Sequence, residues 1–195
     1  MSRNLGSRED VIAQRRLRLS RFQQWAVFCM AIWLTGTVCS AVVATQNFYT
    51  IDRLLANSPS EPFHAAIDKL GSPVGRDLLR YLSSELNRLY FQYWNLVQLP
   101  VGLLALWFVV KLPDSKWPKW GIVGMLGVTL FLMVALTPPI ISVGRTLDFV
   151  PRDPAPPGLR TFGLLHAAFT VFTFINLILG VLVTLWIQQA NERES

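Results

Sequence analysis

Residues 161–187 read TFGLLHAAFTVFTFINLILGVLVTLWI, a run without a single charged side chain. A helix of about 20 apolar residues is long enough to cross the hydrocarbon core of a bilayer. Three more uncharged runs lie upstream of this one, so we expect four membrane spans. Their approximate bounds are 22–47, 89–110, 120–137 and 161–187. The sequence therefore predicts an all-α integral membrane protein, a four-transmembrane-helix bundle.

The composition points to the same class. Of the 195 residues, 52% are hydrophobic and only 15% are charged, whereas charged residues make up about 25% of ordinary soluble domains. Disordered chains and ordinary soluble enzymes are thereby disfavoured. The first apolar run is about twice as long as a usual signal-peptide core, so we expect it to remain as an anchor.

The distribution of arginine and lysine predicts the orientation. Basic residues are dense in segment 1–21 and in the short connection from Lys111 to Lys119, and such segments stay in the cytoplasm. We therefore expect a basic cytoplasmic tail at 1–21, a single membrane domain at 22–188 and a cytoplasmic tail at 189–195. This predicts a multi-pass protein of the bacterial inner membrane with both termini cytoplasmic. The net charge of +6 fits this pattern, and we expect no nucleic-acid partner.

The outer insertion, residues 52–88, should carry amphipathic helices. Pro62–Leu70 is bounded by helix start and stop signals. From Pro73 to Leu89, leucines recur at helical spacing between charged residues, and we expect this leucine face to be buried against the bundle or the outer bilayer surface. Asp77 or Glu85 should pair with Arg80 or Arg88. The insertion is either a structural cap or a site for a ligand or partner.

The second outer connection follows Pro138 and Pro139, which lack backbone donors and should break or kink the third span near Thr137. Arg145 and Asp148, three residues apart, are expected to pair on one helical turn. The alternative is that they bind a lipid phosphate or a quinone head group at the membrane surface.

Polar and small residues inside the spans predict contacts between helices. Asn95, Gln98 and Asn176 are costly in hydrocarbon unless they find partners, so interhelical hydrogen bonding is their expected role. Small residues recur every three positions along the third span and predict close packing of a neighbouring helix; these are Gly121, Gly124 and Gly127.

Histidine is the remaining candidate ligand type. His166 lies one to two turns inside the outer end of the last span, on the side where His64 is expected. The two could ligate a haem or a metal ion, or His166 alone could bind a chlorophyll-type pigment axially. Packing and hydrogen bonding are the alternative for His166, and no cofactor is required by the sequence.

Three local stretches resemble the domain-of-unknown-function 4149 and transmembrane protein 205-like four-span membrane proteins. They are ATQNFYTIDRL at Ala44–Leu54, the aromatic opening Leu89–Trp94, and the Phe162, His166 and Asn176 pattern in the last span. The resemblance implies four spans and no defined activity.

The function expected from the sequence is non-catalytic. We find no set of residues typical of nucleophilic, metal or phosphate chemistry, and no paired carboxylates within a span. We expect an accessory or structural subunit beside a larger energy-converting complex, respiratory or photosynthetic, with other membrane subunits and lipids as partners. Two alternatives stay open, a haem- or pigment-binding redox protein using His166 and a small carrier for lipids or amphiphiles.

Overall fold

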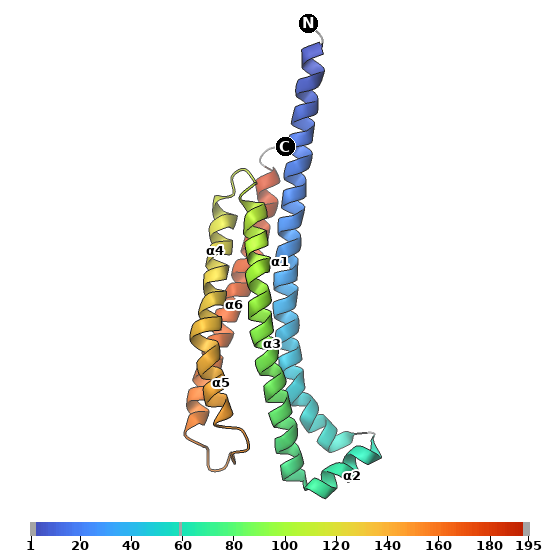
Figure 1. The fold of residues 1–195 in the computed structure, drawn as a ribbon, viewed down its shortest axis with the longest axis vertical. Helices are drawn as coiled ribbons and strands as arrows, with labels where there is room; N and C mark the ends of the chain where they lie inside the picture. The colour runs from blue at the N-terminus through green and yellow to red at the C-terminus, as the bar shows by residue number, and fades with distance from the viewer. Residues whose placement is uncertain (1–2, 59, 193–195) are drawn as a thin grey trace. The chain divides into compact units, whose positions relative to one another are not determined.

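A computed structural model describes residues 3–58 and 60–192, and every regular element in these ranges is helical (Figure 1). In chain order the elements are α1 (Arg3–Asn57), α2 (Glu61–Leu70), α3 (Ser72–Val109), α4 (Lys116–Phe131), the π-helical turn η1 (Leu132–Leu136), α5 (Thr137–Arg145) and α6 (Gly158–Glu192). The all-helical class predicted from the sequence is confirmed. Parts of the two predicted tails, residues 1–2 and 193–195, lie outside the described residues.

Three stretches of helix in the described chain are long and apolar enough to cross a membrane. They are Ala13–Asn57, Lys116–Arg145 and Gly158–Gln189. The apolar half of α3 is not among them, because Gln92, Asn95 and Gln98 lower its mean hydropathy. A protein with several membrane-spanning helices is thus supported by length and composition.

The two prolines after Thr137 do not end the third apolar helix. Because proline has no N–H, the carbonyls of Val134 and Ala135 lose their usual helical donors. The backbone widens into the turn η1, in which the N–H of Thr137 donates to the carbonyl of Leu132 and its hydroxyl donates to the same oxygen at 2.8 Å. The prolines then occupy the first turn of α5, where their missing donors are tolerated. The helical chain thus continues beyond Thr137, where the span was expected to end, as far as Arg145.

The first of the two predicted outer helices matches α2 closely. The hydroxyl of Ser60 accepts from the backbone N–H of Phe63 and caps its start, as serine commonly does. Gly71 ends it with a φ of 82°, a backbone conformation that glycine adopts without steric cost.

The second predicted outer helix is not a separate element, because Pro73–Leu89 is the first half of the continuous helix α3. Its leucine face is covered only in part by the rest of the chain, since Leu82 is 55% exposed whereas Leu79 and Leu86 are half-buried. The buried stripe of this half is instead made of small and polar residues, namely Gly75, Ser83 and Asn87. The leucine face is thus not the main contact face of this half, and its burial against the outer bilayer surface stays a prediction.

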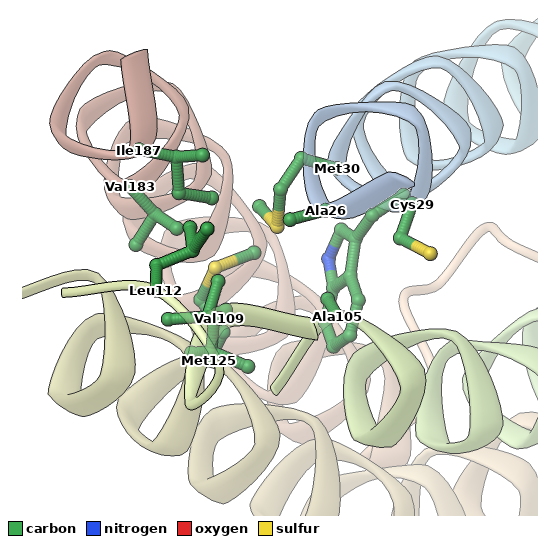
Figure 2. Packing of buried hydrophobic residues seen from close by; sticks show 11 residues of the cluster. Ala26, Cys29, Met30, Ala105, Val109, Leu112, Met125, Val183 and Ile187 are labelled. Atoms are coloured by element: carbon green, nitrogen blue, oxygen red, sulfur yellow. The ribbon is translucent and has the colours of Figure 1, made fainter. Parts of the chain in front are cut away.

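By its contacts the chain divides into two compact units. The first unit contains the described residues up to Thr35, Val97–Thr129 and the described residues from Thr173 onward. Its core, shown in Figure 2, brings together α1, α3, α4, α6 and the connection after α3. The buried apolar residues of this core are Ala26, Cys29, Met30, Trp33, Ala105, Val109, Leu112, Ile122, Met125, Val183 and Ile187.

The second unit contains Gly36–Leu96 and Leu130–Phe172. The indole of Trp94 lies so close to Gly36 that a Cβ there would be 2.0 Å from the ring, and its Nε1 donates to the hydroxyl of Thr37 at 3.1 Å. Asn87 accepts from Asn47 at 2.7 Å and donates to the carbonyl of Ala44 at 2.9 Å. α1 and α3 are thus joined by polar contacts in this unit.

Candidate functional site

The second unit contains a cavity of about 470 Å³, within the size range of small-molecule binding sites. Its walls come from α1, α3, α5, α6 and the loop between α5 and α6. Six aromatic residues line it: Phe48, Tyr81, Phe91, Phe149, Phe162 and Phe169. The cavity is therefore largely apolar and aromatic.

The polarity of the cavity changes along α3. Its lining residues recur at helical spacing, from Asp77 through Arg80, Ser84 and Arg88 to Phe91. At 1.5 Å per residue, this face extends over roughly 21 Å. The charged groups lie toward the start of the helix and the aromatic group lies at the far end, so the cavity has one charged and one apolar end.

In the other walls of the cavity, charged and apolar residues are separated in the same way as on α3. Thr137 near the start of α5 accepts from Asn95 of α3 at 3.5 Å, whereas Asp148 after α5 contacts Arg88. The loop after α5 therefore contributes its charged residues, Asp148 and Arg152, at the charged end. The wall from α5 brings apolar groups, Ile140 and Ile141, to the other part of the cavity.

Arg88 is the central charge of the lining. Its guanidinium binds Glu85 through Nη1 and both carboxylate oxygens of Asp148 through Nη2, at 3.0 and 3.1 Å. The side chains of Arg88 and Asp148 are 11% and 16% exposed. Gly144 of α5 lies beside this group, and a Cβ there would be 3.2 Å from the ring of Phe162. The single guanidinium thus pairs with two carboxylates, which leaves the group with one excess negative charge, and it joins α3 to the loop after α5.

The predicted partner of Asp148 is therefore wrong. The pairing of Glu85 with Arg88 is present as expected, but Asp148 pairs with Arg88 and not with Arg145. Arg145 is exposed and lines a second, shallower hollow beside Asn95 and Thr137. The structure thus places the two candidate head-group ligands, Arg145 and Asp148, on different surfaces of the second unit.

The two histidines have different surroundings. His166 of α6 lines the cavity, and its ring stacks on that of Phe162 with centroids 5.9 Å apart and an interplanar angle of 17°. His64 of α2 lies 3.0 Å, through Nε2, from the carbonyl oxygen of Ser58, and it is not part of the cavity lining. In the described ranges, no three His, Cys, Asp or Glu residues group as metal ligands.

Each of the three amides predicted to join helices is hydrogen-bonded to a residue of another helix. Asn95 contacts Thr137 in the second unit. In the first unit, Thr129 of α4 donates to Gln98 at 3.3 Å and accepts from Asn176 at 3.2 Å. Asn176 also donates to the carbonyl of Met125 at 3.5 Å, and its Oδ1 has no partner among the described residues. Thr129 was missed in the sequence, where a lone threonine in an apolar helix was its only signal.

The aromatic wall was also missed as a site. Tyr81 and Phe91 were visible as aromatic residues ten positions apart on α3, but Phe149, Phe162 and Phe169 join them only through the fold. Phe91 contacts Phe169 with ring centroids 5.3 Å apart, and Tyr81 contacts Phe149 at 5.1 Å. These two pairs connect α3 to α6 and to the loop after α5.

No protein-family model, curated protein or solved structure matches this chain.

Proposed function

We propose that this chain is a non-catalytic, multi-pass membrane protein that holds a lipid-like amphiphile in the cavity of the second unit. The observation that carries the proposal is the polarity of the cavity, with Asp77, Arg80 and Arg152 at one end and the ring pair of Phe91 and Phe169 at the other. An amphiphile has the same division into a polar head and an apolar body. Its apolar part would remove aromatic surface from water while its head remains at the charged end.

We also propose that α3 is a fourth span. Its uncharged part from Leu89 to Val109 is about 30 Å long at 1.5 Å per residue, which matches the hydrocarbon core. The amides that lower its hydropathy, Asn95 and Gln98, are hydrogen-bonded to Thr137 and Thr129, so their polarity is satisfied within the protein. Four crossings would put both termini on one side, which the arginines of segment 1–21 make the cytoplasmic side of a bacterial inner membrane.

Binding rather than catalysis is supported by the chemistry of the lining. The buried guanidinium of Arg88 is engaged by two carboxylates, and His166 stacks on an aromatic ring. The role of an accessory subunit beside an energy-converting complex stays a prediction, as does a haem or pigment on His166.

Filling the cavity tests the proposal. Ser84 lines the cavity midway between Asp77 and Phe91 on α3 and is partly buried, so the Ser84→Trp variant would place an indole in the space of the ligand. We expect the purified wild-type chain to retain about one phospholipid after detergent exchange. The variant should lose at least about 90% of it, measured by native mass spectrometry.

Leu82→Trp is the matched control, because Leu82 lies two residues away on the same helix, is exposed and does not line the cavity. It introduces the same indole and should leave the retained lipid unchanged. Helical circular dichroism and elution as one species would show that both variants are folded. Equal lipid retention by Ser84→Trp and the wild type would contradict the proposed function.

A further inference from the structure

We infer that the amphiphile has a zwitterionic head group, a phosphate with a nearby ammonium, as in phosphatidylethanolamine. The inference rests on the proposed function and concerns the charged end of the same cavity. It follows from which charges there are already paired and which are not.

The innermost charged side chain of the lining, Arg88, is already ion-paired within the protein. Arg88 binds both Glu85 and Asp148, so this group of one cation and two anions has no free guanidinium for an anionic ligand. Three charged side chains of the lining remain, and they lie at the rim: Asp77, Arg80 and Arg152. Among the described residues none of the three has an ion-pair partner, and Arg152 only donates to the carbonyl of Leu147 at 3.4 Å.

The rim places these charges on two facing elements. Asp77, Arg80 and Tyr81 share one face of α3, because residues three and four apart are neighbours on a helix. Phe149 and Arg152 lie on the loop after α5. The rings of Tyr81 and Phe149, 5.1 Å apart, join the two elements. One carboxylate, two guanidiniums and two aromatic rings therefore border the same opening.

Phe149 is held at this opening in an unusual backbone conformation. Its φ is 58°, in the left-handed region that large side chains rarely adopt. Its ring is nevertheless 57% exposed, so burial alone does not explain why the backbone is held this way. Strained residues of this kind recur at sites that clamp ligands.

A zwitterionic head group has a complementary group for the carboxylate, the two guanidiniums and the two aromatic rings at the rim. A phosphate between Arg80 and Arg152 would accept charge-assisted hydrogen bonds from both guanidiniums. An ammonium beside it would face the carboxylate of Asp77 and the rings of Tyr81 and Phe149, combining an ion pair with a cation–π contact. A purely anionic head would leave Asp77 without a counter-charge, and an uncharged head would leave all three rim charges unpaired.

Lipid competition tests this inference. The probes are dioleoyl phosphatidylethanolamine, dioleoyl phosphatidylglycerol and dioleoylglycerol, which share their acyl chains and differ in the head group. The three lipids are added together to the full chain in detergent, and the amount of each lipid that the protein retains is measured. The amount retained by the cavity-filled Ser84→Trp variant is subtracted from the amount retained by the wild type. Because the chain carries a net charge of +6, non-specific attraction favours the anionic phosphatidylglycerol. We expect the opposite order, with phosphatidylethanolamine preferred about fivefold, as for one partly exposed charge contact.

Two sets of variants test the proposed contacts of the ammonium and of the phosphate separately. Asp77→Asn should abolish the preference for phosphatidylethanolamine, whereas Asp68→Asn, which removes an exposed acid of α2 outside the cavity, should preserve it. The double variant Arg80→Gln, Arg152→Gln should weaken both phospholipids about tenfold relative to dioleoylglycerol, since it removes two charge-assisted contacts.

The outcomes separate the inference from the proposed function. Suppose that Ser84→Trp reduces lipid binding, but the wild type retains phosphatidylglycerol as well as phosphatidylethanolamine or better. This result would overturn the inference of a zwitterionic head group and leave the proposed function standing. An unchanged preference in Asp77→Asn would also overturn it. Lipid retention that Ser84→Trp does not reduce would instead overturn the proposed function.

Discussion

Replacing Arg88 with methionine should lower the free energy of unfolding by about 3–5 kcal/mol, the usual cost of removing one partner from a buried ion pair. The guanidinium is 11% exposed and serves two carboxylates, Glu85 and Asp148. Without it, both carboxylates must either protonate or remain close together with uncompensated charge. Methionine keeps much of the apolar volume, so the effect reports the charge more than the packing. Steric trapping in bicelles would measure the free energy of unfolding.

The matched control is Arg76→Met. Arg76 also pairs with an aspartate, Asp52, but the two side chains are 50% and 63% exposed. Exposed pairs contribute at most about 1 kcal/mol, so this variant should change stability little. Similar losses in the two variants would contradict the view that the Arg88 group joins α3 to the loop after α5.

Adding one methyl group at Gly121 should destabilise the first unit by about 1–3 kcal/mol, the typical cost of overpacking a core. A Cβ at Gly121 of α4 would lie 2.3 Å from Cγ2 of Val183 and 3.3 Å from the ring of Trp186, both on α6. Val183 is itself fully buried and has no space into which to move. Gly121→Ala should therefore lower the free energy of unfolding in the same assay.

Gly127→Ala is the matched control on the same helix. Apart from the backbone of its own helix and its chain neighbours, no atom lies within 4 Å of the position that its Cβ would occupy, and alanine is favoured over glycine in a helix by up to about 1 kcal/mol. We expect this variant to be neutral or more stable. A loss of stability at position 127 equal to that at 121 would mean that helix approach at Gly121 is not the cause.

The glycines also show how far sequence could predict packing. Their spacing of three predicted a close helix contact, and Gly121 makes one with α6. Gly124 would make only an ordinary contact with Leu179, at 3.4 Å, and Gly127 would make none. Spacing identifies a face of a helix, but the extent of contact along that face depends on where the neighbouring helix lies.

The helices themselves were largely predictable because their signals are local. Uncharged runs indicated the apolar helices, and Pro62, Gly71 and Pro73 around α2 defined its ends within a residue. The main contact face of the first half of α3 was not predicted, because periodicity shows that a helix has two faces without showing which one packs against the rest of the chain. Here the small and polar stripe with Ser83 and Asn87 contacts α1.

The candidate site could not be predicted from local sequence patterns. Asp148 is three residues from Arg145 but pairs with Arg88, which is sixty residues away in the chain. The response of the backbone to Pro138 and Pro139, a wide turn at Leu132–Leu136, keeps α5 helical and lets it form one wall of the cavity. Aromatic residues from α1, α3, α6 and a loop meet there only because these elements pack together.

The central claim is that the cavity of the second unit holds an amphiphile, and photo-crosslinking tests it most directly. Phosphatidylethanolamine with a photoreactive group in its acyl chain would be bound at one molecule per delipidated chain, and the labelled residues would be mapped by mass spectrometry. We predict labels on Phe91 and Phe169, at the apolar end of the cavity, and their loss in Ser84→Trp. Labels concentrated instead on exposed residues outside the cavity, such as Val134, and unchanged in Ser84→Trp, would contradict the claim.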